Sequence, residues 1–198
     1  FNARTALGLR RSSPEMDTTF GFTYAYGTDD GEKSKSRAEL NGRNDWKFGE
    51  SPWGMFAQGR LEFDEFTNYK WRLSGAVGPS YTFIKPEPFL LRGRVGVGGS
   101  YEWAGPAPNE VFVPEGLVGL DFGWKIDERQ GLFATIDYLP SLRSPPDFRL
   151  DMKGGYQIVV DPSSKLMLMA GVADRYNSNP QGRKRNDVEY FLTLGWEF

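Results

Sequence analysis

Histidine and cysteine are both absent from this chain of 198 residues. Without an imidazole the chain cannot form a Ser-His pair, a His-Asp protease site or the usual histidine zinc site. Without a thiol it has no disulfide, no thiolate nucleophile and no zinc-thiolate site. These absences remove most of the common catalytic chemistry, so we expect no enzyme, no cofactor and no metal site.

Long hydrophobic runs and a charge of one sign are missing as well. No apolar run reaches the roughly 18 residues that a membrane helix needs, and the mean hydropathy is −0.52. Alternating strands would hide a lipid-facing surface from such an average, so these values do not exclude a membrane barrel. With 24 basic and 26 acidic residues, the chain carries no basic field that would attract nucleic acid. The segment from Phe1 to Arg4 does not resemble a secretion signal, which we expect to have been removed or to lie outside this sequence.

What the chain does have in quantity is glycine and aromatic residues, 24 glycines and 15% aromatics. This composition favours many strands joined by turns over helices. The length leaves room for one domain, so we expect a single all-β unit over residues 1–198.

The last thirteen residues, 186–198, show the strand pattern most clearly. The even positions of this stretch are all apolar: Val188, Tyr190, Leu192, Leu194, Trp196 and Phe198. The odd positions are mostly polar, which predicts a strand with one apolar and one polar face. Such a strand ending on an aromatic residue is typical of an outer-membrane barrel, and resembles the signal that the barrel-assembly machinery reads.

The same alternation recurs along the whole chain between turn-forming residues. It predicts eleven strands, near residues 1–10, 16–26, 38–48, 53–64, 69–83, 89–103, 112–126, 132–138, 148–160, 166–176 and 186–198. Their length suits a crossing of an outer membrane at a tilt of about 40°.

The connections predict the two ends of the barrel. Tight turns near residues 12–15, 49–52, 84–88, 127–131 and 161–164 fall on one end, which we expect to be periplasmic; the loops near Asp29, Thr67, Pro106, Ser144 and Gln181 fall on the other. The first strand would then start outside the cell. Because bacterial single-chain barrels have an even number of strands, we expect a missing N-terminal strand. The predicted fold is therefore an antiparallel up-and-down transmembrane β-barrel, with eleven strands visible and twelve in the complete protein.

Aromatic residues fall at both ends of the apolar faces, as in two interfacial girdles. The candidates are Trp71, Tyr81, Phe83, Phe89, Tyr101, Trp103, Trp124, Trp196 and Phe198. A rise of about 3.3 Å per residue separates Trp71 from Tyr81 by roughly 25 Å across a tilted sheet. A soluble sandwich would place its aromatics in mid-strand.

The polar faces put charged residues of both signs inside the barrel. The candidates for lining the lumen are Arg72, Arg92, Arg94, Glu62, Glu102, Asp121, Arg149 and Asp151. One interpretation is a lumen filled by interlocking salt bridges. The other is a narrow pore for small anions, with Arg72, Arg92 and Arg94 forming a basic ladder.

Three further interpretations are weaker. Asp147 and Asp151 could support acid-base chemistry, but with Arg149 between them they resemble a solvated ion network. A soluble ligand-binding barrel would need the apolar faces to point inward. The loop charges Arg183, Lys184 and Arg185 could bind anionic lipid or lipopolysaccharide phosphates, although a solvated loop explains them more simply.

Several stretches resemble a known family: Asp64-Glu65-Phe66, Trp71 to Gly78, Tyr138-Leu139-Pro140-Ser141, Asp174 to Pro180 and Asn186-Asp187. Together they are similar to the salt-induced outer-membrane proteins of the YdiY type, domain of unknown function family 481 (DUF481). The opening Trp-x-Gly-Ser strand of that family is not found here, in agreement with a missing strand. The resemblance implies a twelve-stranded barrel in the outer membrane of a Gram-negative bacterium, alone or as a subunit of a larger envelope complex. It implies no biochemical activity.

Overall fold

The computed structural model describes residues 2–29, 32–67, 70–85, 87–105, 111–180 and 185–197. These residues contain eleven strands and no helix, hence no helix that could span a membrane. The strands are β1 (Asn2–Ser12), β2 (Met16–Asp29), β3 (Glu32–Lys47), β4 (Trp53–Asp64), β5 (Trp71–Ile84), β6 (Phe89–Trp103), β7 (Val111–Lys125), β8 (Gln130–Pro140), β9 (Phe148–Asp161), β10 (Leu166–Asn177) and β11 (Asn186–Glu197).

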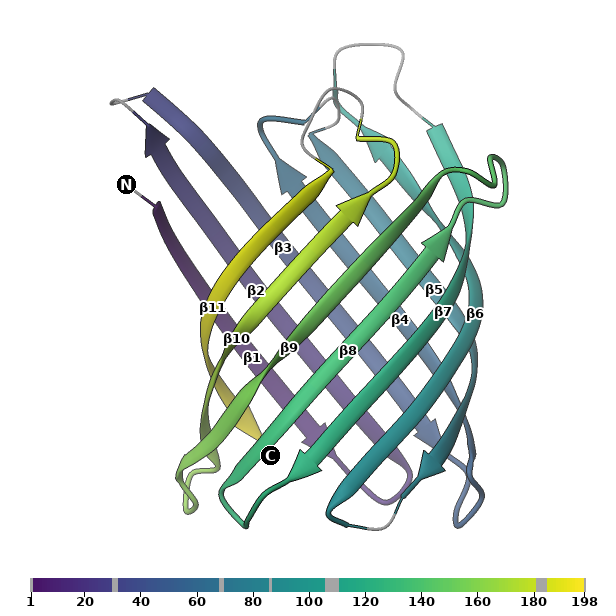
Figure 1. Ribbon diagram of the computed structural model, residues 1–198, viewed down its shortest axis with the longest axis vertical. Coiled ribbons are helices and arrows are strands. Elements are labelled where there is room, and N and C mark those ends of the chain that lie inside the picture. Colours follow the sequence, from purple (N-terminus) through teal and green to yellow (C-terminus); the bar gives the residue numbers. More distant parts are fainter. Residues whose placement is uncertain are drawn as a thin grey trace.

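The strands form one closed barrel in which each is paired with its neighbours in sequence (Figure 1). All sequential pairs are antiparallel, and the barrel closes through a parallel pair between β1 and β11. The predicted all-β barrel with up-and-down strands, and the count of eleven visible strands, are confirmed.

The strand bounds agree closely with the alternation, with one clear difference. β3 starts at Glu32, whereas the sequence predicts a strand only from about residue 38. Residues 32–37 present no apolar face, so the alternation of apolar and polar residues gives no sign of a strand there. The backbone nonetheless continues to pair with β2 as far as Asp29 and Glu32.

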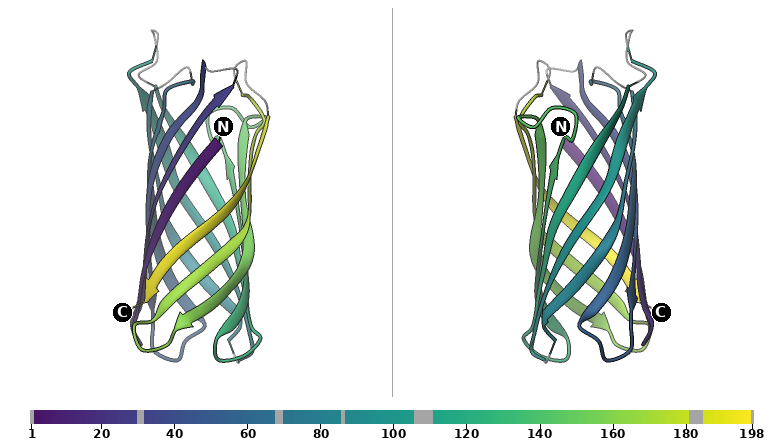
Figure 2. Two further views of the ribbon diagram at one scale, coloured as in Figure 1. Left: turned by 90° about the vertical axis from the view of Figure 1, so that its left-hand side faces the viewer. Right: turned by 90° about the vertical axis from the view of Figure 1, so that its right-hand side faces the viewer.

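The connections sort onto the two ends as predicted. Those between β1 and β2, β3 and β4, β5 and β6, β7 and β8, and β9 and β10 lie at one end, here named the turn end. The strand ends that the remaining connections join lie at the other end, here named the loop end, near the start of β1; β11 finishes at the turn end (Figure 2). Of the predicted loop positions, Pro106, Gln181, Arg183 and Lys184 lie outside the described residues.

Side chains alternate between the wall and the lumen, and the polar ones point inward. In β7, Glu115, Leu117 and Asp121 are buried, while Val118 and Leu120 between them are exposed. Across the described residues, twelve polar or charged side chains are buried and only six hydrophobic ones. The barrel is therefore inside-out relative to a soluble domain, whose buried residues are mainly apolar.

The parallel pair forms a seam that differs from every other junction. β1 and β11 are in register only from Leu7 with Leu194 to Arg10 with Glu197, near the turn end. Toward the loop end the two strands diverge (Figure 1). A strand running the opposite way would be antiparallel to both, so the seam is where the predicted twelfth strand would fit. The count of twelve stays a prediction.

Glycine is required where β5 and β6 approach each other closely on the lumen side. A Cβ on Gly98 would lie 1.9 Å from the carbonyl oxygen of Gly75, and a Cβ on Gly78 would lie 2.0 Å from that of Val95. No side chain fits at such distances without moving the backbone. Beside this tight junction a small apolar cluster lies in the lumen: Phe56, Leu117 and Leu139.

This close approach predicts that Gly98→Ala lowers the free energy of unfolding by about 1–3 kcal/mol, the usual cost of overpacking. The matched control is Gly59→Ala, whose new Cβ would find its nearest neighbour at 3.8 Å. That variant should lie within about 0.5 kcal/mol of the parent. Urea unfolding in detergent micelles, followed by tryptophan fluorescence, measures both, and equal stability of the two variants would contradict the tight junction.

Candidate functional site

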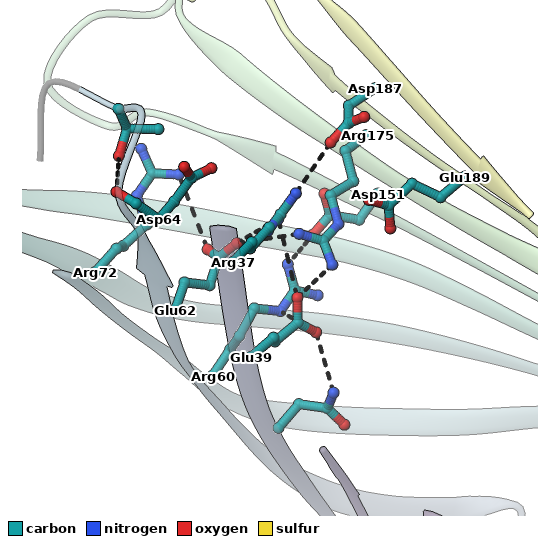
Figure 3. A network of polar contacts seen from close by, with 12 residues as sticks. Arg37, Glu39, Arg60, Glu62, Asp64, Arg72, Asp151, Arg175, Asp187 and Glu189 are labelled. Atoms are coloured by element: carbon teal, nitrogen blue, oxygen red, sulfur yellow. Dashed lines mark hydrogen bonds and ion pairs between the residues drawn. The ribbon is translucent and has the colours of Figure 1, made fainter. Parts of the chain in front are cut away.

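The lumen is crossed by two networks of ion pairs, built from residues on the inward positions of the strands. We name the first the loop-side network: Arg37, Glu39, Arg60, Glu62, Asp151 and Arg175 (Figure 3). The second is the turn-side network: Arg43, Gln58, Arg94, Asp121 and Asp137. Both join strands on opposite walls.

Glu62 is the centre of the loop-side network. Its Oε1 accepts hydrogen bonds from Arg37 Nη2 at 2.7 Å and from Arg175 Nη1 at 3.1 Å. Arg175 on β10 also donates to Glu39 on β3, and Arg60 on β4 donates to Asp151 on β9 at 2.5 Å. Because β9 and β10 lie across the barrel from β3 and β4, these bonds span the lumen rather than run along its wall.

Arg94 holds the turn-side network together. It is the most deeply buried charged residue, with 1% of its surface exposed. Its Nη2 donates to Asp121 at 2.9 Å and to Asp137 at 2.7 Å, and its Nη1 donates to Gln58 at 2.8 Å. From the opposite wall, Arg43 donates to Asp121 at 2.5 Å. The guanidinium of Arg94 also lies 5.4 Å from the ring centroid of Phe56.

All eight residues predicted to line the lumen form ion pairs. Glu62 and Asp151 belong to the loop-side network, and Arg94 and Asp121 to the turn-side network; the others pair as Arg72 with Glu102, Arg149 with Glu115 at 2.6 Å, and Arg92 with Asp45 at 3.3 Å. Each predicted residue therefore has a partner of opposite charge.

The predicted basic ladder is not continuous. Arg92 and Arg94 occupy successive inward positions of β6, but Arg72 lies far from them along the sheet. In the register of β5 and β6, Arg72 faces Glu102 while Arg92 faces Thr82, near the other end of the pair. The three arginines form ion pairs with three separate sets of carboxylates.

The eight predicted residues leave out several members of the networks, and two further lumen residues, Arg175 and Phe56, show why. Both share the parity of inward residues on their strands: Phe56 lies two positions before Gln58, and Arg175 two positions after Ala173. The alternation therefore contained the signal for both. Phe56 was hard to anticipate because an apolar side chain on a polar face breaks the pattern that identifies the face.

The predicted girdle residues gather into two aromatic clusters. At the turn end, Trp53 contacts Tyr81 at 4.9 Å between ring centroids, and Phe89 contacts Trp124 at 5.7 Å. Tyr81 also contacts Phe83. At the loop end, Trp71 and Tyr101 both contact Trp103, at 6.3 and 5.8 Å. Trp196 lies near the turn end of β11, and Phe198 lies outside the described residues.

The networks divide the interior into three cavities. A loop-end cavity of about 140 Å³ and a mid-lumen cavity of about 230 Å³ share Arg60, Arg149, Asp151 and Arg175 in their linings, so these residues form the wall between them. A third cavity of about 70 Å³ lies at the turn end, and its lining has no residue in common with the other two. In the described residues, no group of three or more acidic side chains is arranged to hold a metal ion.

Charged side chains at the loop end are more exposed to solvent than those in the lumen. Lys33 donates a hydrogen bond to Glu65, in the connection between β4 and β5, and this bond lowers the pKa of the Glu65 carboxyl below its ordinary value. Both side chains are exposed to solvent. Such a pair contributes little to stability.

The contrast predicts different outcomes for the same change at two glutamates. Glu62→Gln removes a buried charge that serves Arg37 and Arg175, and should lower the free energy of unfolding by about 3 kcal/mol. Glu65→Gln removes an exposed charge and should cost no more than about 1 kcal/mol. Urea unfolding in micelles compares them, and a loss at Glu62 as small as that at Glu65 would contradict a lumen held by ion pairs.

Comparison with known protein families matches one family over residues 1–198, described as a protein of unknown function, DUF481. The searches found no similar curated protein and no similar solved structure. The match covers every segment that carried the resemblance in the sequence, including Asp174 to Pro180. This chain belongs to the DUF481 family.

Proposed function

We propose that the protein is an outer-membrane β-barrel of the Gram-negative envelope, with a structural role and a lumen filled by ion pairs. The observation that carries this proposal is the inside-out wall, with apolar side chains outside and charged ones inside. The proposal assigns no catalysis to any residue.

The outer surface supports a hydrocarbon environment. Val95, Val97 and Val118 in the middle of their strands are 59%, 63% and 52% exposed, and Leu192 is 62% exposed. In water, a continuous apolar wall would drive association. In a bilayer the same wall faces lipid tails at no cost, while the closed sheet satisfies the backbone polar groups.

The distribution of side chains argues against a soluble ligand-binding barrel. Such a barrel buries its apolar faces around the ligand and exposes its charges. Here Glu39, Glu62, Arg94 and Asp121 are buried instead. The two aromatic clusters fit the interfaces of a bilayer, where amphipathic rings contact head groups.

Short turns mark the periplasmic side in bacterial barrels, so we assign the turn end to the periplasm and the loop end to the outside. The partners that follow are outer-membrane lipid, lipopolysaccharide at the loop end, and the assembly machinery at the end of β11. The structural role is supported by the networks, because conduction would require water and ions to replace bonds such as that between Arg60 and Asp151.

A narrow channel for small anions is the second candidate. It is supported by the cavities at the loop end, in mid-lumen and at the turn end, each of which has arginine in its lining. Opening it would require the side chains between the cavities to move.

The membrane proposal predicts that Val97→Arg, in mid-strand on the outer wall, makes folding into bilayers less favourable by about 2–4 kcal/mol. Leu142→Arg is the control, because Leu142 is similarly exposed at 59% but lies in the connection between β8 and β9. That control should change the free energy by less than about 1 kcal/mol. Urea titration of folding into lipid vesicles measures both, and equal costs would argue against a lipid-facing wall.

Conductance in planar bilayers separates the two candidates. For a lumen filled by ion pairs, we expect the folded protein to give no steady single-channel current. Anion-selective steps that change when Arg92 and Arg94 are replaced by Ala would instead establish the channel. If no current is seen, a shift in gel mobility on heating checks that the protein in the sample is folded.

A further inference from the structure

The mid-lumen cavity is large enough for a ligand and is lined by donors. Its volume is about 230 Å³, against about 30 Å³ for each water molecule in the liquid. Six cationic side chains and four carboxylates line it: Arg43, Arg60, Arg94, Arg149, Lys153 and Arg175, with Glu39, Glu115, Asp137 and Asp151. The hydroxyl groups of Thr19, Thr23 and Thr135 also lie in the lining.

The four carboxylates are already engaged by arginines of the same lining. Arg149 donates to Glu115, Arg94 to Asp137, Arg60 to Asp151 and Arg175 to Glu39. A cation entering the cavity would have to compete with guanidinium groups for these oxygens. An anion would meet the remaining N–H groups.

Arg149 has an N–H group without an acceptor. Its Nε is buried, and it has no hydrogen-bond partner within the part of the chain that the structure describes. A buried donor without a partner is unfavourable, so a shift of the Arg149 side chain that brings this N–H to an oxygen atom of an anion in the cavity would be favourable.

Lys153 brings a second cation to the same strand. It lies two inward positions after Arg149 on β9, and its ammonium is 4.7 Å from the ring centroid of Phe191 and 6.0 Å from that of Phe133. The two rings hold the ammonium at the edge of the cavity. Arg149 and Lys153 therefore present two cationic groups to one space.

We propose that the mid-lumen cavity binds a tetrahedral oxyanion of the phosphate class, with Arg149 and Lys153 as its main ligands. In the lining itself, six cationic side chains stand against four carboxylates, but Asp45, Asp121 and Glu62 outside the lining also bind Arg43, Arg94 and Arg175. The donor groups of Arg149 and Lys153, rather than a net charge, therefore select the anion. The proposal goes beyond the structural role and does not depend on conduction or on the membrane.

Isothermal titration of inorganic phosphate into the folded protein in an uncharged detergent tests the site. We expect saturable binding that Arg149→Lys and Lys153→Gln each weaken about tenfold, the effect of losing one charge-assisted hydrogen bond. Arg149→Lys keeps a positive charge beside Glu115. The matched controls are Arg92→Lys and Lys47→Gln, the same changes at residues that line the turn-end cavity, and they should leave the affinity unchanged.

A second titration with a short-chain phosphatidic acid separates a free anion from a lipid head group. Binding of phosphate, lost in the two site variants and kept in the controls, supports a site for the free anion. Binding of the lipid alone, with the same losses, assigns the same chemistry to a head group. Absence of both from the folded parent protein, or equal losses in the controls, would overturn the proposal. If Arg149→Lys does not fold, the phosphate affinity of Lys153→Gln tests the site alone. Phosphate binding in detergent does not depend on insertion into a bilayer. The membrane proposal and the oxyanion proposal can therefore be contradicted independently.

Discussion

The neutralisation of buried charge across the lumen is the constraint on which the rest of this structure depends. A guanidinium as deeply buried as that of Arg94 persists only if carboxylates surround it, because an isolated charge in a low-dielectric interior is very costly. Asp121 and Asp137, on strands close to that of Arg94, form ion pairs with it. Asp121 also accepts a hydrogen bond from Arg43 on the opposite wall. These pairs tie the height and the rotation of one wall to the other, so the sheet can close in only one register.

The same period-two alternation produces both the charged interior and the apolar wall. A slip of one residue in a strand would place its whole charged set in the wall and its apolar set in the lumen. In β4, such a slip would turn Arg60 and Glu62 outward and bring Leu61 and Phe63 inside. The ion-pair networks and the apolar wall thus specify one register together, even though the described residues form only a small apolar cluster.

The alternation predicted the strands, their order, both ends of the barrel and the face of nearly every residue, because each depends on near neighbours in sequence. It could not predict which arginine meets which carboxylate. Parity gives the face of a residue but not its height in a tilted barrel, and this is why Arg72 appeared to belong with Arg92 and Arg94. The extension of β3 to Glu32 and the parallel seam could not be predicted either, because backbone pairing determines them.

The networks also explain how side chains can cross a lumen without filling it densely. Arginine and glutamate side chains are long, and each bond that spans the lumen leaves space beside its aliphatic stem. Arg60, Arg149 and Arg175 line cavities on both sides of the wall that they form. A barrel closed by apolar packing would leave only dry voids, in which no ion could be accommodated. Ion pairs across the lumen leave polar cavities instead, and an unpaired donor such as the Nε of Arg149 favours an anion over a cation in one of them. Under the two proposals, the ion pairs that fill the lumen would also provide the place for a bound oxyanion.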